Sequence, residues 1–161
     1  MNESKETEFN LVEAGMHDLE MLVPLFDKYR IFYDQPSDLV LARRFLRARI
    51  EHRNSVIFLA VEPLEDGEKA LGFTLLYPSY NSVMATPIWI LNDLYVDESA
   101  RRRGIAQALI ARGRTLAEET GARVMSLSTA KTNGPSRELY EALGFQLDET
   151  FCTYTLQLGE A

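Results

Sequence analysis

The sequence is poor in the residues that build covalent and metal-bound frameworks. Cys152 is the only cysteine among 161 residues, and His17 and His52 are the only histidines. A single cysteine excludes an intramolecular disulfide and is typical of a reducing compartment. Because cysteine and histidine do not cluster, we expect no zinc site and no other metal site.

Long apolar runs and an excess of positive charge are also missing. The longest uninterrupted apolar run is Val56 to Val61, far short of the ~20 residues that cross a bilayer. The first eight residues lack the basic and apolar blocks of a signal peptide, so we expect a cytoplasmic protein with no membrane partner. The net charge of −7 disfavours a nucleic acid as partner and favours a cationic one.

What is present fits one compact globular domain. The chain is 46% hydrophobic and 25% charged, which is ordinary for a soluble domain. A chain of this length buries roughly 70% of its unfolded surface, so a hydrophobic core can form without disulfide bonds or a bound metal. We find no internal repeat and no linker. Residues 9–161 are therefore expected to form a single domain behind a disordered tail at residues 1–8.

Hydrophobic periodicity predicts strands that alternate with helices. The order strand, two helices, three strands, helix, strand, helix, strand predicts a mixed α/β sheet, with a crossover helix between neighbouring strands. The expected strands are 9–13, 56–62, 71–80, 88–96, 124–128 and 151–158, and the expected helices are 18–33, 39–52, 105–120 and 134–143.

The segment from Val96 to Ala106 joins a strand to the start of a helix and contains three consecutive arginines before a glycine. Unpaired amides at a helix N-terminus, a glycine that lets an anion approach, and adjacent arginines together suit a pyrophosphate. The alternative is a solvated turn, because short glycine motifs also match by chance. The candidate residues are Arg101, Arg102, Arg103, Gly104, Ile105 and Ala106.

Three stretches in sequence order resemble motifs of the GCN5-related N-acetyltransferases. Residues 101–106 are similar to the acetyl-CoA-binding motif Arg/Gln-x-x-Gly-x-Gly/Ala, the strand 89–96 precedes it, and residues 133–145 follow it. The resemblance implies acetyl-CoA as cosubstrate and a mostly antiparallel sheet whose fourth and fifth strands splay apart. The pantetheine arm would enter that gap and pair with backbone groups of Leu94, Tyr95 and Val96.

Within this family the sequence is most similar to diamine or polyamine N-acetyltransferases. Those enzymes commonly carry a glutamate where this chain has Asn92, and an amide cannot accept a proton at neutral pH. The catalytic candidates in this strand are therefore Asp93 and Asn92, and if Asn92 points into the cleft the base is a water molecule that relays the proton to more distant groups. Asp93 is a carboxylate in an apolar strand, so it has a partner or opens onto a cleft. Neighbours in a regular strand face opposite sides, so only one of the two reaches the acceptor unless a bulge intervenes.

The downstream motif supplies a second catalytic candidate. The resemblance places Tyr140 beside the thioester sulfur, where a phenol with a pKa of about 10 can protonate a thiolate whose pKa is about 8.5. The alternative is a core tyrosine at helical spacing from Leu143. Asn133 and Ser136 would bind the pantetheine or the phosphates, and they also suit a helix N-cap.

The resemblance implies direct transfer of an acetyl group to a primary amine of a small molecule, such as a polyamine, an amino acid or a related metabolite. A cationic amine can stack on Tyr33 or Tyr80 near Asp34, which makes these three the expected substrate-binding residues. Two alternatives stay open: acetylation of a protein lysine or N-terminus, and a non-catalytic acyl-CoA-binding module. The family also implies a homodimer, for which the strand at 151–158 is one candidate interface.

Overall fold

The computed structural model describes residues 9–159, so the tail predicted at residues 1–8 lies outside the described residues. The chain divides into two compact units between Ser128 and Thr129. We call the part up to Ser128 the sheet unit and the part from Thr129 the C-terminal unit. None of the helices within residues 9–159 has the length and apolar character needed to cross a membrane.

The sheet unit is built on a five-stranded sheet with the order β1-β2-β3-β4-β5. Neighbouring strands from β1 to β4 are antiparallel, whereas β4 and β5 are parallel. This confirms the expected mixed, mostly antiparallel sheet. The strands are β1 (Asn10–Glu13), β2 (Val56–Leu64), β3 (Gly67–Asn81), β4 (Thr86–Val96) and β5 (Val124–Leu127).

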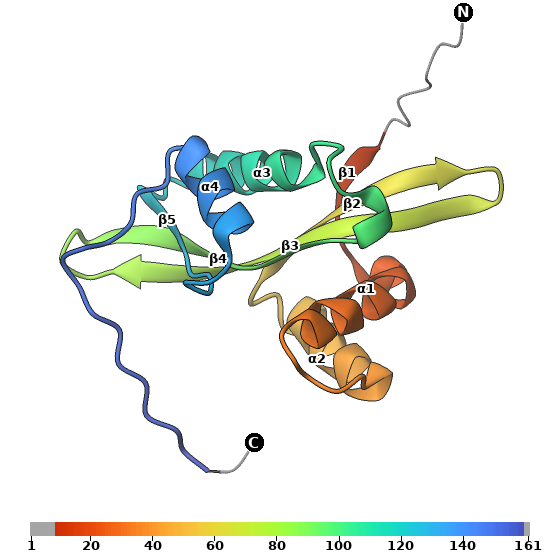
Figure 1. Ribbon diagram of the computed structural model, residues 1–161, viewed down its shortest axis with the longest axis horizontal. Coiled ribbons are helices and arrows are strands. Elements are labelled where there is room, and N and C mark those ends of the chain that lie inside the picture. Colours follow the sequence, from red (N-terminus) through yellow and green to blue (C-terminus); the bar gives the residue numbers. More distant parts are fainter. Residues whose placement is uncertain (1–8, 160–161) are drawn as a thin grey trace, which may run out of the picture. The chain divides into compact units, whose positions relative to one another are not determined.

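Helices cover both faces of this sheet (Figure 1). The helices α1 and α2 lie on one face, and α3 lies on the other. Asp38 begins α2, since its side chain accepts a hydrogen bond from the amide of Leu41 at 2.8 Å, as expected for a helix N-cap. The helices are α1 (Leu19–Phe32), α2 (Leu39–His52) and α3 (Ile105–Glu119), with two short 3-10 helices, η1 (Met16–Asp18) and η2 (Glu98–Ala100).

The main hydrophobic core lies between the sheet and the pair α1 and α2. Leu22 and Val23 of α1 and Leu46 of α2 pack with Phe73 and Leu75 of β3, and all five are almost fully buried. Burial of each such side chain contributes about 1.5–3 kcal/mol relative to its exposure. This core fixes the position of α1 on the face of β4 that carries the candidate site.

β4 contains a bulge at Asn92. Leu91 pairs with Leu76 of β3, and Asp93 pairs with Leu75, the residue directly before Leu76. Asn92 is therefore an extra residue in the β3–β4 ladder. An extra residue of this kind shifts the alternation of side chains along the strand that contains it.

The bulge determines which way Asp93 points. Leu76 contacts α3 at Gly113, so the residues of β4 paired with it face α3. Leu75 belongs to the core under α1 and α2, so its partner Asp93 faces α1. Tyr95 lies two residues further along and faces α1 as well, where its ring lies 6.3 Å from that of Tyr29.

Only the first half of β4 pairs with β5. The parallel ladder runs from Ile88 and Val124 to Leu91 and Leu127, where β5 ends. Residues 92–96 of β4 have no partner on β5 in the described part of the chain. The expected separation of the fourth and fifth strands is thus present, and it begins at the bulge.

The C-terminal unit differs from the sequence prediction. It contains α4 (Gly134–Ala142), as predicted, but residues 151–158 form no strand in the described part of the chain. The prediction of a terminal strand is wrong in this structure. The apolar alternation that suggested it fixes which side chains share a face, but a strand also needs a neighbour for its backbone groups.

Candidate active site

The first part of the candidate site is the Arg–Gly loop, residues 101–106, which leads from η2 into the first two residues of α3. Its backbone passes twice through the left-handed region, at Arg102 (φ 61°) and at Gly104 (φ 76°). For a non-glycine residue that conformation costs roughly 1–2 kcal/mol, and such strained residues cluster at functional sites. The turn allows α3 to begin directly at Ile105.

The N-terminus of α3 suits an anion. The first backbone hydrogen bond of the helix runs from the amide of Ala108 to the carbonyl of Gly104 at 3.0 Å. No side chain in the described residues caps the helix, and its first turn carries no acidic residue. Amides that precede the first helical hydrogen bond need acceptors, and the helix dipole favours a negative charge beside them.

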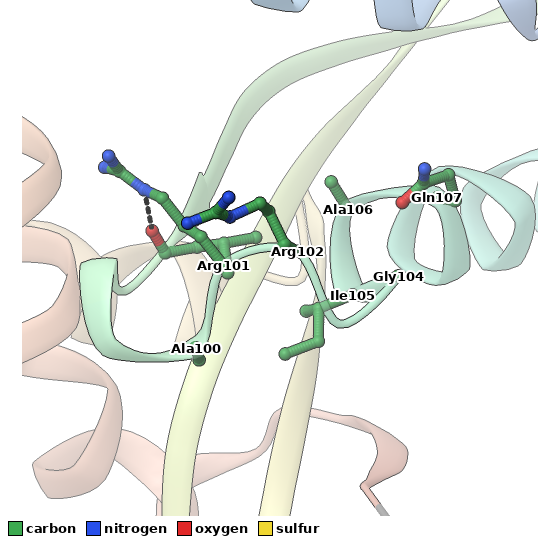
Figure 2. A pocket seen from close by; sticks show the side chains of 8 residues that line it. Ala100, Arg101, Arg102, Gly104, Ile105, Ala106 and Gln107 are labelled. Carbon is green, nitrogen blue, oxygen red and sulfur yellow. Dashed lines mark hydrogen bonds between the residues drawn. The ribbon is translucent and has the colours of Figure 1, made fainter. Parts of the chain in front are cut away.

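A hollow of about 190 Å³ lies in front of this helix start (Figure 2). A Cβ atom added at Gly104 would meet no atom within 4 Å, so the space beside the glycine is open. Arg101 and Arg102 are exposed on this side, and Nε of Arg101 donates to the carbonyl of Val96 at 3.3 Å. The lining residues are Val96, Ala100, Arg101, Arg102, Gly104, Ile105, Ala106 and Gln107.

Arg103 differs from its two neighbours. Its guanidinium donates to Oε1 of Glu62 on β2 at 2.9 Å, and both side chains are largely buried. Arg103 is not among the residues that line the hollow. Of the three arginines that the sequence proposed for the pyrophosphate, only Arg101 and Arg102 line the hollow.

Asp97 stabilises the turn that leads into the Arg–Gly loop. Its Oδ1 accepts hydrogen bonds from the amide and the hydroxyl of Ser99 at 3.0 and 2.7 Å, and its Oδ2 pairs with the ammonium of Lys28 on α1. These donors hold the pKa of Asp97 well below its ordinary value of 3.8. The turn that leads into the Arg–Gly loop is therefore fixed by an ionised carboxylate.

The second part of the site surrounds Asp93 on the α1 face of β4. The Asp93 side chain is buried, with 6% of its surface exposed. Its Oδ1 accepts hydrogen bonds from the hydroxyl of Tyr29 at 2.6 Å and from the side-chain amide of Asn92 at 3.0 Å. Burial raises the pKa of Asp93 above 3.8, and the two hydrogen bonds act in the opposite direction. A buried carboxylate with a raised pKa is a candidate general base.

Because of the bulge, Asn92 and Asp93 are not on opposite sides. The side-chain amide of Asn92 donates a hydrogen bond to Asp93, so the two side chains lie next to each other. The expectation that they face opposite sides applies to a regular strand, and this strand has a bulge. Tyr29 was missing from the residues proposed for the site. It precedes Tyr33, the C-cap residue of α1, by four residues, so helical spacing places the two tyrosines on one face.

The expected substrate-binding residues are not equally close to Asp93. The ring of Tyr33 lies 5.1 Å from that of Tyr29, and Asp34 follows it in an exposed turn with φ 59°. Tyr80 pairs with Pro87, five β3 residues beyond the partner of Asp93, which is ~17 Å along a strand. The structure therefore brings Tyr33 near the carboxylate, but not Tyr80.

The remaining candidates belong to the C-terminal unit. Asn133 caps α4, since its side chain accepts a hydrogen bond from the backbone amide of Ser136 at 3.4 Å, and Pro135 occupies the first turn. The ring of Tyr140 lies 5.9 Å from that of Phe145 in an edge-to-face arrangement. Within residues 9–159 no group of His, Cys, Asp or Glu side chains could hold a metal ion.

Comparison with known proteins agrees with this geometry. The chain matches the acetyltransferase (GNAT) family over residues 19–145. It is 40% identical to the uncharacterized N-acetyltransferase YhfO of Bacillus subtilis (strain 168), over 92% of this chain and 97% of the relative. It is 30% identical to an aminoglycoside N(6')-acetyltransferase type 1 of Salmonella typhimurium, over 74% of this chain and 80% of the relative. A crystal structure of a probable acetyltransferase superposes with a TM-score of 0.87 at 39% identity, covering 94% of this chain and 99% of the other. The chain thus belongs to the acetyltransferase (GNAT) family and is an N-acetyltransferase with acetyl-CoA as its cosubstrate.

Proposed function

We propose that this enzyme transfers the acetyl group to a primary amine of a small cationic molecule such as a polyamine, an amino acid or a related metabolite. The observation that carries the proposal is the buried carboxylate of Asp93, placed by the bulge on the face of β4 next to Tyr29 and Tyr33. A carboxylate flanked by aromatic rings suits an ammonium group. The aminoglycoside acetyltransferase relative supports a small-molecule amine as the acceptor, and the likeness to diamine and polyamine acetyltransferases that we propose from the sequence motifs favours the same class.

The donor side of the proposal uses the Arg–Gly loop. Arg101, Arg102 and the first amides of α3 would hold the pyrophosphate of acetyl-CoA, because they combine positive charge with open space beside Gly104. The half of β4 that has no partner on β5 would bind the pantetheine arm through the backbone of Leu94, Tyr95 and Val96.

The neutral amine attacks the thioester carbonyl carbon, and backbone donors near Leu94 stabilise the oxyanion. Asp93 takes the proton that the amine nitrogen loses, the carbon–sulfur bond breaks, and Tyr140 protonates the CoA thiolate. The products are the N-acetylated amine and CoA. In the C-terminal unit, Asn133 and Ser136 would contact the pantetheine or the phosphates in addition to capping α4.

A panel of acceptors tests the proposal. The full chain is incubated with acetyl-CoA and spermidine, putrescine, single amino acids, an aminoglycoside, a lysine peptide or an α-amino peptide, and CoA release is followed. We expect a small cationic amine to have the highest kcat/KM, at least about tenfold above either peptide. A preferred peptide would favour protein acetylation. Tight acetyl-CoA binding without turnover on any amine would favour a non-catalytic acyl-CoA-binding module.

The oligomeric state and the location are also proposals. We propose a homodimer because the family resemblance implies one, and we propose a cytoplasmic location because of the sequence composition. Sedimentation of the purified chain at micromolar concentration measures the first, and we expect the mass of a dimer, about twice the 18.3 kDa of one chain. A monomer at every concentration would exclude a stable dimer.

A further inference from the structure

The two oxygens of the Asp93 carboxylate have different surroundings. Both hydrogen bonds that its side chain accepts within the described residues, from Tyr29 and from Asn92, go to Oδ1. Oδ2 accepts no hydrogen bond from a described residue, although Asp93 as a whole is buried. One oxygen is held by these two donors, and the other is not.

Tyr29 is well placed to hold this carboxylate in a single orientation. Its ring contacts Phe73 of β3 at 5.7 Å and Tyr95 of β4 at 6.3 Å, both edge-on. Tyr33, the C-cap residue one turn later, packs against it with the ring centroids 5.1 Å apart. A ring surrounded in this way has little rotational freedom, so its hydroxyl is directed at Oδ1 before any substrate arrives.

Asn92 completes the arrangement from the other side. It is exposed, it is the extra residue of the bulge, and its amide reaches the same oxygen as the Tyr29 hydroxyl. Its amide group cannot take a proton, but as a donor it suits the neighbour of a carboxylate that can. The asparagine is thus explained without assigning it to the base.

From this geometry we infer that Tyr29 and Asn92 are positioning residues that hold Oδ1 of Asp93, so that Oδ2 is the atom that binds the acceptor nitrogen and takes its proton. The inference deepens the proposed function and rests on it for the identity of the acceptor. The positioning itself is a property of the protein without substrate.

The ionisable groups around Asp93 come from four elements. Tyr29 belongs to α1, Tyr77 to β3 and Tyr95 to β4, while Arg49 of α2 acts on Tyr77. Burial raises the pKa of Tyr77, the negative charge of Asp93 raises it further, and Arg49 lowers it. The groups that directly lower the pKa of Asp93 are Tyr29 and Asn92, so their removal makes the carboxylate easier to protonate.

The test compares Tyr29→Phe and Asn92→Ala with Tyr33→Phe as the matched control, which removes a neighbouring hydroxyl from the same helix. The first readout is the carbon-13 NMR titration of the Asp93 carboxyl in the substrate-free protein. We expect its midpoint to move to higher pH in Tyr29→Phe and in Asn92→Ala, and to stay unchanged in Tyr33→Phe. Because Asn92 is exposed, its variant serves if Tyr29→Phe does not fold.

The second readout is the acid limb of kcat/KM for the best amine of the panel. It should move to higher pH in the same two variants, with a loss of at least about tenfold below the new limb, while KM for acetyl-CoA stays within twofold. An unchanged Asp93 titration in both variants would overturn the inference. A shifted titration in a protein without turnover on any amine would leave the positioning intact and reject the proposed function instead.

Discussion

Lys28 and Asp97 join the first helix to the end of the fourth strand. The ammonium of Lys28 pairs with Oδ2 of Asp97, and the next residue of α1, Tyr29, donates to Asp93 four residues earlier on β4. Two consecutive residues of one helix therefore support both parts of the candidate site: the turn into the Arg–Gly loop and the carboxylate beside the acceptor. The segment from Asp93 to Asp97 has no partner on β5, so these contacts with α1 add to its pairing with β3.

The Lys28–Asp97 pair predicts a pH-dependent contribution to stability. The pKa of Asp97 is lowered by folding, so its contribution is complete above the ordinary pKa of 3.8 and is lost as the pH falls below that value. We expect Asp97→Asn to lower the free energy of unfolding by about 1 kcal/mol at pH 7, and by progressively less below pH 4. Urea unfolding at pH 7 and pH 3 measures the difference.

A pair on the surface provides the control for this experiment. Arg114 and Glu118 are 70% and 62% exposed, so Glu118→Gln should change the free energy of unfolding by at most a few tenths of a kcal/mol. An equal effect of Asp97→Asn at both pH values would show that charge at Asp97 does not contribute.

Gly104 offers a comparison of two side chains of equal size. Asp and Asn both tolerate the left-handed conformation, and the space beside Gly104 is open, so both variants should fold. Only Asp places a negative charge where we propose the pyrophosphate. Calorimetry should show a CoA affinity for Gly104→Asp at least about tenfold below that of Gly104→Asn. Equal affinities would mean that the phosphates bind elsewhere.

The three arginines should have separable roles. Arg101→Met and Arg102→Met are expected to weaken CoA binding, each by about three- to tenfold at low salt, with a smaller effect at high salt. Arg103→Met should instead lower stability, because it leaves the largely buried Glu62 without its ion pair. Thermal unfolding and CoA titration of the same three proteins separate these effects. If Arg103→Met lost as much CoA affinity as the other two at unchanged stability, the assignment would be wrong.

The sequence predicted most elements but not the directions of the decisive side chains. The helix expected at 39–52 has those bounds, because Asp38 caps it and its apolar stripe is regular. The facing of Asp93 was not predictable, since alternation alone cannot locate a bulge. The sequence alone cannot distinguish Arg103 from Arg101, because only the folded structure brings Glu62 of β2 next to Arg103. The prediction of a strand at residues 151–158 was wrong, because a strand needs a neighbouring strand for its hydrogen bonds, and the apolar alternation does not show whether one is present.

The net charge of the chain predicts how the acceptor arrives. With a net charge of −7, the surface should attract a cationic amine over the Debye length, which is ~10 Å at 0.1 M salt. We expect kcat/KM for the best amine to fall as sodium chloride rises from 20 to 500 mM, with kcat less affected. A neutral or anionic preferred substrate, or a flat salt profile, would contradict this prediction.

Tyr140 is the proposed general acid, and Phe is the substitution that tests it. Phe keeps the ring that packs against Phe145 but removes the proton that the CoA thiolate would receive. Tyr140→Phe should lower kcat by at least about tenfold while CoA affinity stays nearly the same, because general acid catalysis typically contributes 10²–10⁴-fold.

The loss should fall at the low end of that range, since a thiolate is a tolerable leaving group and water can partly replace the phenol. Phe145→Leu is the matched control, because it changes the neighbouring ring without touching the hydroxyl, and it should retain most of the kcat. Stopped-flow detection of CoA release gives kcat for both variants. A folded Tyr140→Phe protein with wild-type kcat on its best amine would show that this tyrosine packs in its unit and donates no proton to the leaving group.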